Sequence, residues 1–208
     1  MIPTTDLSVL IDRKFATKPD KLRDNSPKFI VLHSTKNYPD YDSLYFLHTR
    51  IYQWNGIGYH VFVSNGKAYL NRDFEMEGAH CLGLNFNSIG LCIHLKNHIP
   101  KTTDLDIAKN VIAKIRSQYG PLPLISHTKG QIRYINKLSE KKGLTTGVPE
   151  GIEIASEYEF MDIKERLMDF SNREHLDKHP YLNSLIKNFK NCPGTAFYDF
   201  IKEVNQND

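Results

Sequence analysis

Short, dense apolar runs alternate with segments of helical spacing, and this alternation restricts the chain to a mixed α/β fold. Runs at 28–33 (KFIVLH), 89–95 (IGLCIHL) and 122–127 (LPLISH) are flanked by turn residues, which is typical of strands buried on both faces. Residues 104–119 form an amphipathic helical pattern that a Gly-Pro pair ends. We therefore predict an α/β fold with a mixed, largely buried central β-sheet flanked by helices.

A hairpin is the clearest local motif. Residues 59–63 (YHVFV) and 67–70 (KAYL) are strand-like and are joined by Ser64-Asn65-Gly66. An Asn-Gly pair between strand-like runs is the strongest short hairpin signal. We therefore predict two antiparallel strands here.

The remaining elements suggest one domain with an N-terminal addition. Residues 1–27 are polar and contain three prolines, so we predict an N-terminal extension with a short helix over 6–15. The domain itself is predicted to span 28–204. Apolar residues at helical spacing predict a helix over 41–54 and a final helix over 193–204.

Composition excludes several classes of protein. The chain is 40% hydrophobic and 25% charged, which supports a packed core, and its net charge is only +3, which does not argue for nucleic acid. We see no apolar run long enough for membrane insertion and no signal peptide. Three cysteines make a disulfide framework unexpected, so we expect a chain made in the cytoplasm. We also expect a monomer.

Three residues have the chemistry of a metal site. His33 and His127 each end an apolar run, and Cys192 lies near the C-terminus. Two imidazoles and one thiolate are sufficient protein ligands for a catalytic zinc, which keeps a fourth position open for water. Their separations along the chain match no compact zinc finger. Spacing alone therefore leaves a structural alternative open, in which the two histidines are hydrogen-bonded polar residues and the cysteine is a small apolar residue.

Longer motifs carry a family resemblance. The segments FIVLHST, GYHVFVSNGKAYLNRD, EGAHCLGLNFNSIGLCIHL, ISH and KNCPG follow one another along the chain. In this order they resemble the type 2 N-acetylmuramoyl-L-alanine amidases, and among them the short phage lysozyme-amidases and the peptidoglycan-recognition proteins of the same fold. The resemblance covers residues 28–128 and 189–204.

The resemblance implies a role for each of six residues. It places His33, His127 and Cys192 at the zinc-ligand positions. It places Tyr59 and Lys190 at the catalytic positions and His80 at a substrate-binding position. A related branch of cytosolic amidases has glutamate and aspartate where this chain has Cys92 and Cys192, so the chain sides with the phage and recognition-protein branch.

The implied chemistry is amide hydrolysis. Zinc held by histidine and cysteine lowers the pKa of its bound water and polarises a carbonyl. Lys190 or Tyr59 can donate to the oxyanion that forms. Because no glutamate occupies the family's general-base position, the group that moves the proton stays open. His60 points away from Tyr59 along the strand, which predicts a core or supporting role.

The expected function is zinc-dependent cleavage of the amide bond between N-acetylmuramic acid and L-alanine of peptidoglycan. The protein would be an endolysin or an exported toxin. It would reach the cell wall after release or dedicated export. The alternative is a non-catalytic module that binds peptidoglycan or muropeptide. Inactive recognition proteins typically lack the ligand cysteine, so Cys192 favours the enzyme. Two further alternatives are a zinc hydrolase that cleaves another amide and a regulator that binds a polymerase.

An insertion separates two of the expected ligands. Between His127 and Cys192 lie 64 residues, far more than in the compact relatives, and we place the insertion at about 130–188. It contains two predicted helices, near 158–170 and 180–189. The insertion could form a lid over the cleft or a solvated decoration, and either His175 or His179 within it could replace His127 as a ligand.

Overall fold

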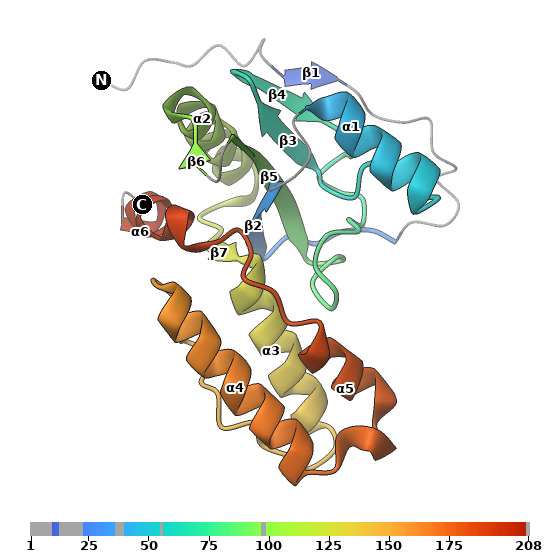
Figure 1. Ribbon diagram of the computed structural model, residues 1–208. Coiled ribbons are helices and arrows are strands. Elements are labelled where there is room, and N and C mark those ends of the chain that lie inside the picture. The colour runs from blue at the N-terminus through green and yellow to red at the C-terminus, as the bar shows by residue number, and fades with distance from the viewer. Residues whose placement is uncertain (1–9, 13–22, 36–39, 55, 97–98, 207–208) are drawn as a thin grey trace.

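The computed structural model describes residues 10–12, 23–35, 40–54, 56–96 and 99–206. A mixed β-sheet has helices on both faces, and three further helices extend beyond one end of the sheet (Figure 1). The strand order is β1-β4-β3-β5-β2-β7, and β6 pairs with β5 outside this order. This arrangement confirms the predicted fold class.

The elements follow one another in an alternating order. The strands are β1 (Leu10–Asp12), β2 (Phe29–Thr35), β3 (Val61–Ser64), β4 (Lys67–Leu70), β5 (Ser88–Lys96), β6 (Ile99–Pro100) and β7 (Leu124–Ser126). The helices are α1 (Tyr41–Phe46), α2 (Thr102–Tyr119), α3 (His127–Glu140), α4 (Glu157–Arg173), α5 (Pro180–Lys187) and α6 (Tyr198–Gln206). A π-helical turn, Leu47–Ile51, continues α1, and short 3-10 turns precede α5 and α6. No helix in the described part of the chain is long and apolar enough to cross a membrane.

Strand β2 lies at the centre of the parallel part of the sheet. It pairs in parallel with β5 on one side and with β7 on the other. The register sets His33 opposite Cys92, and Cys92 in turn opposite Phe62 of β3. Because side chains alternate along a strand, these three share one face of the sheet while Leu32 points to the other.

The main core lies on the Leu32 face, beneath α2 and α6. Its buried side chains come from both the sheet and these helices, and include Ile30, Leu32, Val61, Val63, Leu91, Ile93, Val111, Ile112, Ile115, Phe200 and Val204. Burying one such side chain stabilises the fold by roughly 1.5–3 kcal/mol. The opposite face carries a smaller apolar cluster beneath α1, in which Leu44, Phe62 and Cys92 pack together.

The predicted hairpin is confirmed. Strands β3 and β4 are antiparallel, and the turn residues Asn65 and Gly66 both have positive φ, 53° and 72°. Such a turn matches the right-handed twist of the strands that it joins. The Gly66 amide also donates to Oδ1 of the buried Asp104 at 2.7 Å, which ties the hairpin to the first turn of α2.

The predicted helices near the N-terminus have mixed outcomes. The helix predicted over 41–54 begins as expected, because the Asp40 side chain accepts a hydrogen bond from the Ser43 amide at 2.8 Å, but it ends at Ile51. The short helix predicted over 6–15 is wrong where it can be tested. Residues 10–12 form β1, which pairs in parallel with β4, and the rest of that range lies outside the described residues.

Helix α3 was not predicted from the sequence. Residue His127 was expected to end a strand, but β7 ends at Ser126 and His127 begins the helix. The Ser126 side chain accepts from the Lys129 amide at 3.1 Å and so caps the helix N-terminus. Charged residues and a glycine at 130 obscured the pattern, although Ile132 and Ile135 form its buried face.

Helices α3, α4 and α5 form a unit with its own apolar core, seen at the bottom of Figure 1. The helices predicted near 158–170 and 180–189 are confirmed as α4 and α5. A capping box between Ser156 and Glu159 begins α4. The unit also contacts the sheet, since the Arg133 guanidinium lies over the Phe29 ring at 4.7 Å from its centroid.

We predict that Phe170→Ala destabilises the protein strongly, because Phe170 is fully buried in the core of this unit. Removing a buried phenylalanine costs about 3–5 kcal/mol of unfolding free energy. Urea unfolding measures the effect. Tyr158→Ala on the same helix is the control, since Tyr158 is 83% exposed and should change the free energy by no more than about 0.5 kcal/mol. Equal losses in the two variants would contradict the assignment of this core.

Candidate functional site

A cleft opens on the His33 face of the sheet, opposite α2 and α6. Its floor is formed by the end of β2 and by Tyr59, and one wall comes from α1 and the turn that follows it. Its lining residues are His33, Ser34, Thr35, Leu44, Leu47, His48, Tyr52, Trp54, Tyr59, Ala79, His80, His127, Lys190 and Cys192. Of the helical unit, only His127 at the start of α3 lines the cleft, and none of residues 129–189, all of which the structure describes, does so. The rest of the unit therefore lies beside the cleft.

Three of the predicted site residues meet in this cleft. One ligand-type atom from each of His33, His127 and Cys192 lies within 4.8 Å of the others. Within the described ranges no other cluster of potential ligand residues forms, so neither His175 nor His179 takes the place of His127. The Cys192 Sγ is 3.8 Å from His33 Nδ1, close to the spacing of about 3.5 Å that two ligands have on tetrahedral zinc.

The protonation states of the two histidines suit a metal. Burial, followed by the neighbouring His127 and His80, lowers the pKa of His33 well below its ordinary value. Burial, followed by the charge of Lys190, lowers the pKa of His127 to about 4. Both rings are therefore neutral at pH 7, and the buried His127 Nδ1 has no hydrogen-bond partner. An unpartnered buried nitrogen beside a second imidazole and a thiol is a donor set that fits zinc.

Thr128 holds the cysteine segment against the histidines. Its hydroxyl accepts from the Cys192 amide at 2.9 Å and lies 2.9 Å from the Lys190 carbonyl, to which it can donate. Its own amide donates to the Cys192 carbonyl at 3.0 Å. One residue therefore joins the start of α3 to a segment 64 positions later in the chain.

Ser34 makes a matching contact from the sheet. Its hydroxyl donates to the Pro193 carbonyl at 2.7 Å. Each histidine of the trio is thus followed by a hydroxyl residue that binds the segment containing Cys192. Sequence reasoning missed these two roles, although the local patterns HST and SHT place the hydroxyls beside the histidines.

Tyr59 lies beside the trio, as predicted for a residue of the site. Its ring centroid is 4.9 Å from that of His33, and it packs against the apolar cluster that contains the buried Cys92 thiol. Burial, followed by the neighbouring thiols of Cys92 and Cys192, raises the pKa of Tyr59 well above its ordinary value. The phenol therefore keeps its proton at neutral pH and can act as a donor.

Lys190 stands at the lip of the cleft. It is exposed, and its backbone amide donates to Gln131 Oε1 at 3.2 Å, which fixes the main chain next to α3. Its charge is one cause of the lowered pKa of His127. The structure therefore places a cation at the mouth of the cleft, beside the trio.

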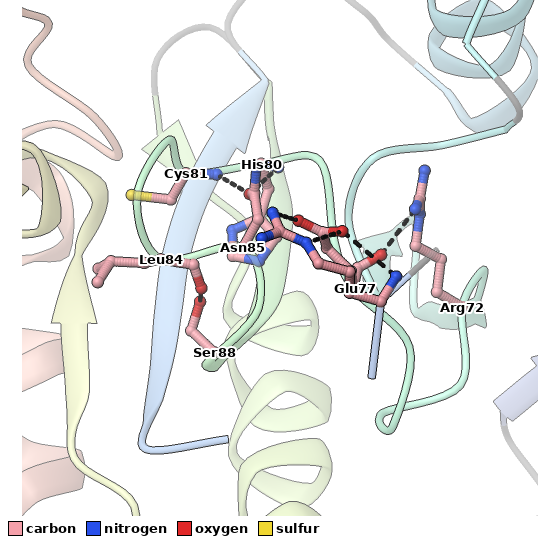
Figure 2. Close-up of polar contacts among 8 residues, drawn as sticks. Arg72, Glu77, His80, Cys81, Leu84, Asn85 and Ser88 are labelled. Carbon is pink, nitrogen blue, oxygen red and sulfur yellow. Dashed lines mark hydrogen bonds and ion pairs between the residues drawn. The ribbon is translucent and has the colours of Figure 1, made fainter. Parts of the chain in front are cut away.

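His80 lies behind His33 rather than among the trio. Its Nδ1 is 3.1 Å from His33 Nε2. Burial, followed by the neighbouring His60, lowers the pKa of His80 well below its ordinary value, so the ring is neutral. Figure 2 shows the loop that holds it, in which Asn85 Oδ1 accepts from the backbone amides of both His80 and Cys81 at 2.8 Å.

His60 occupies the core, consistent with the prediction that it points away from Tyr59. It is fully buried, its Nδ1 accepts from the Gly90 amide at 2.9 Å, and its Nε2 lies 2.8 Å from the Met76 carbonyl. Both ring nitrogens are therefore engaged with the backbone. The remaining cysteines, Cys81 and Cys92, are buried free thiols.

Known proteins resemble this chain in sequence and in fold. Residues 23–142 match the model of the family described as N-acetylmuramoyl-L-alanine amidase. The match covers more than half of the chain and ends two residues after α3. None of the curated protein sequences compared with the chain matches it.

Solved structures share the fold at low identity. The endolysin N-acetylmuramoyl-L-alanine amidase LysCS from Clostridium intestinale URNW has a TM-score of 0.52 and 19% identity over 59% of this chain and 82% of its own. Bumblebee peptidoglycan recognition protein SA has a TM-score of 0.51 and 18% identity over 58% and 83% of the two chains. Peptidoglycan recognition protein LE, solved with tracheal cytotoxin, has 0.51 and 23% identity over 59% and 84%.

We predict that Thr128→Val destabilises the folded protein by about 1–3 kcal/mol, because valine keeps the shape but leaves the Cys192 amide and the Lys190 carbonyl without the hydroxyl. Urea unfolding in the presence of a chelator measures the effect without metal. Thr145→Val, at an exposed position, is the control and should stay within about 0.5 kcal/mol of wild type. A neutral Thr128→Val would show that the hydroxyl does not hold the segment.

We predict that folding stability falls as the pH drops from about 6.5 to about 4, because buried histidines resist protonation. Burial, followed by Arg72, lowers the pKa of His48 to about 4. The unfolded chain takes up this proton at higher pH than the folded one, so acid favours unfolding. Each such group contributes a slope of about 1.4 kcal/mol per pH unit inside this window.

Denaturant unfolding in chelator at several pH values tests this dependence. His48→Asn keeps an acceptor for the Gly58 amide, which donates to His48 Nδ1 at 3.2 Å, and should remove about one proton from the slope. The exposed Thr145→Val, which removes no titrating group, is the control and should keep the wild-type slope. An unchanged slope in His48→Asn would contradict the assignment.

Proposed function

We propose, from the premise that this chain belongs to the N-acetylmuramoyl-L-alanine amidase family, that it is a zinc-dependent amidase. Its substrate is the amide bond between N-acetylmuramic acid and L-alanine of peptidoglycan. The observation that carries the proposal is the meeting of His33, His127 and Cys192 in one cleft of a chain from this family. Zinc is the cofactor that this donor set suits best.

A binding module without activity is the second candidate. Peptidoglycan recognition proteins share this fold, and one of them was solved with a monomeric peptidoglycan. The presence of Cys192 beside the two histidines favours the enzyme, because a thiolate completes a three-ligand site and leaves a fourth position for water. A binding module would have no use for that open position.

The chemistry of the reaction divides between the metal and the protein. When bound, zinc supplies a water of lowered pKa and polarises the scissile carbonyl. The protein must then orient the amide, donate to the oxygen that gains charge, and deliver a proton to the leaving amine. The cleft offers candidate side chains for the first two of these tasks.

Tyr59 is a donor toward the reacting carbonyl. Its ring adjoins His33, and its raised pKa keeps the hydroxyl protonated at neutral pH. A neutral phenol can stabilise an oxyanion by hydrogen bonding without first losing a proton. The Cys92 thiol beside it is a weak acceptor, so the hydroxyl is available to a stronger acceptor on a substrate.

Lys190 supplies positive charge on the side of His127. Because the ammonium is exposed, it can reach a substrate at the mouth of the cleft without paying for burial of its charge. An ammonium near the carbonyl oxygen stabilises developing negative charge. Lys190 and Tyr59 thus provide donors from two directions.

An aromatic wall lines the side of the cleft nearest α1. The Trp54 ring is 5.3 Å from the Tyr52 ring and 4.8 Å from His48, and both Trp54 and Tyr52 are exposed. His48 in turn adjoins Tyr59 at 5.6 Å. This run of rings gives a muropeptide an apolar surface that leads to the trio.

We predict that Cys192→Ser abolishes zinc binding and peptidoglycan cleavage together, because serine is a much poorer zinc ligand than a thiolate. Mass spectrometry of digested peptidoglycan should show free stem peptides beginning at L-alanine with zinc-loaded wild type and none with the variant. Cys81→Ala removes a thiol outside the trio and should keep both properties. Muropeptides that bind wild type but stay uncut would identify a recognition module instead.

A further inference from the structure

Two glycines form the slot that the His80 ring occupies. A Cβ atom added to Gly78 would lie 2.4 Å from His80 Cδ2, and one added to Gly90 would lie 2.6 Å from both Cδ2 and Cγ of the same ring. Real Cβ atoms do not approach other atoms this closely. The imidazole therefore fits only because both positions lack a side chain.

The slot is closed on its far side by the core histidine. A Cβ on Gly78 would also lie 2.9 Å from His60 Cε1, and the His60 and His80 rings meet edge to face at 5.5 Å. His60 itself is fixed through both nitrogens to the backbone of Gly90 and Met76. The wall behind His80 is therefore rigid.

The loop around His80 is fixed by hydrogen bonds within itself. Asn85 Oδ1 accepts from the amides of His80 and Cys81, and the Ser88 hydroxyl donates to the Leu84 carbonyl at 2.6 Å (Figure 2). The Gly78 amide donates to the Asn85 carbonyl at 2.9 Å. The position of the His80 ring is thus set by the protein and needs no ligand.

The two ring nitrogens of His33 face different neighbours. Its Nδ1 faces Cys192 Sγ at 3.8 Å, and its Nε2 faces His80 Nδ1 at 3.1 Å. A histidine that binds a metal through Nδ1 carries its proton on Nε2. That proton then points at His80 Nδ1, which accepts it in a hydrogen bond.

We propose that His80 is a positioning residue for the metal site: held in its glycine slot, it accepts a hydrogen bond from His33 Nε2 and so fixes the tautomer and the ring orientation of that ligand. The inference rests on the proposed zinc site. It differs from the substrate-binding role that the resemblance implied, because His80 here acts on the reaction through its hydrogen bond to His33.

Zinc affinity of two His80 variants tests the proposal. Competition with a chromogenic chelator measures the dissociation constant of zinc in the full-length protein. His80→Phe keeps a ring but cannot accept, and should weaken zinc binding by about 10–100-fold. His80→Asn can place Oδ1 near the position of Nδ1, and should bind zinc within a few-fold of wild type.

A double-mutant cycle tests the slot separately. The three nearest contacts of a Cβ on Gly90 are to the His80 ring, so Gly90→Ala should weaken zinc binding although it touches no ligand. In a His80→Ala background the obstructed ring is gone, so Gly90→Ala should cause no further loss. Additive losses in the cycle would show that Gly90 does not act through His80 and would overturn the slot.

The tautomer of His33 can be read without any substitution. In zinc-loaded wild type, nitrogen-15 NMR of the imidazoles should show a protonated His33 Nε2 and an unprotonated His80 Nδ1. A protonated His80 Nδ1 would overturn the proposal even if the His80 variants failed to fold.

Two other outcomes distinguish a failure of the His80 inference from a failure of the proposed amidase function. Unchanged zinc affinity in folded His80→Phe, with a raised KM for muropeptide, would make His80 a substrate-binding residue and overturn the inference while leaving the amidase intact. Wild type that binds no zinc would instead overturn the metal part of the proposed function, and the inference with it.

Discussion

The site depends on the hydrogen bonds of Thr128. His127 begins α3, Cys192 follows α5, and no strand or helix joins them directly. The Thr128 hydroxyl and amide bind the backbone on both sides of Asn191, and so bring the thiol beside the two imidazoles. These hydrogen bonds of Thr128 therefore set the separation of His127 and Cys192.

Burial is the leading cause of the electrostatic character of the site. Desolvation is the largest cause of the lowered pKa of His33, His80 and His127. Neighbouring histidines add to it at His33 and His80, and the charge of Lys190 adds to it at His127. The cleft therefore holds neutral bases with available lone pairs rather than a cluster of positive charge. A cation that binds two of them relieves the cost of leaving buried nitrogens unpartnered.

Local patterns predicted much of the fold, and long-range contacts decided the rest. The buried strands and the Asn65-Gly66 turn were visible because each depends on neighbouring residues. Helix α3 was missed because Gly130 lowers helix propensity by about 1 kcal/mol, and its advantage appears only in the structure. A Cβ there would lie 2.9 Å from Cys81 and Leu84, so the glycine allows close packing of a distant loop.

In the candidate site too, local patterns predicted some features and long-range contacts decided the others. The predicted trio meets in one cleft, and Tyr59 and Lys190 adjoin it. The contact between His80 and His33 could not be predicted, because it needs Gly78 of the same loop and Gly90 of β5 together to make room for a ring. The supporting hydroxyls of Ser34 and Thr128 were adjacent to known candidates, but their partners lie more than 60 residues away.

Hydrogen bonds between Thr128 and Cys192 close the intervening chain into a long loop whose two ends are in contact. For such a loop, each doubling of length costs only about 0.6 kcal/mol of closure entropy. This loop also buries an apolar core of its own, which offsets the entropic cost of closing it. The junction can therefore accept segments of different length while its hydrogen bonds hold Cys192 beside His33 and His127.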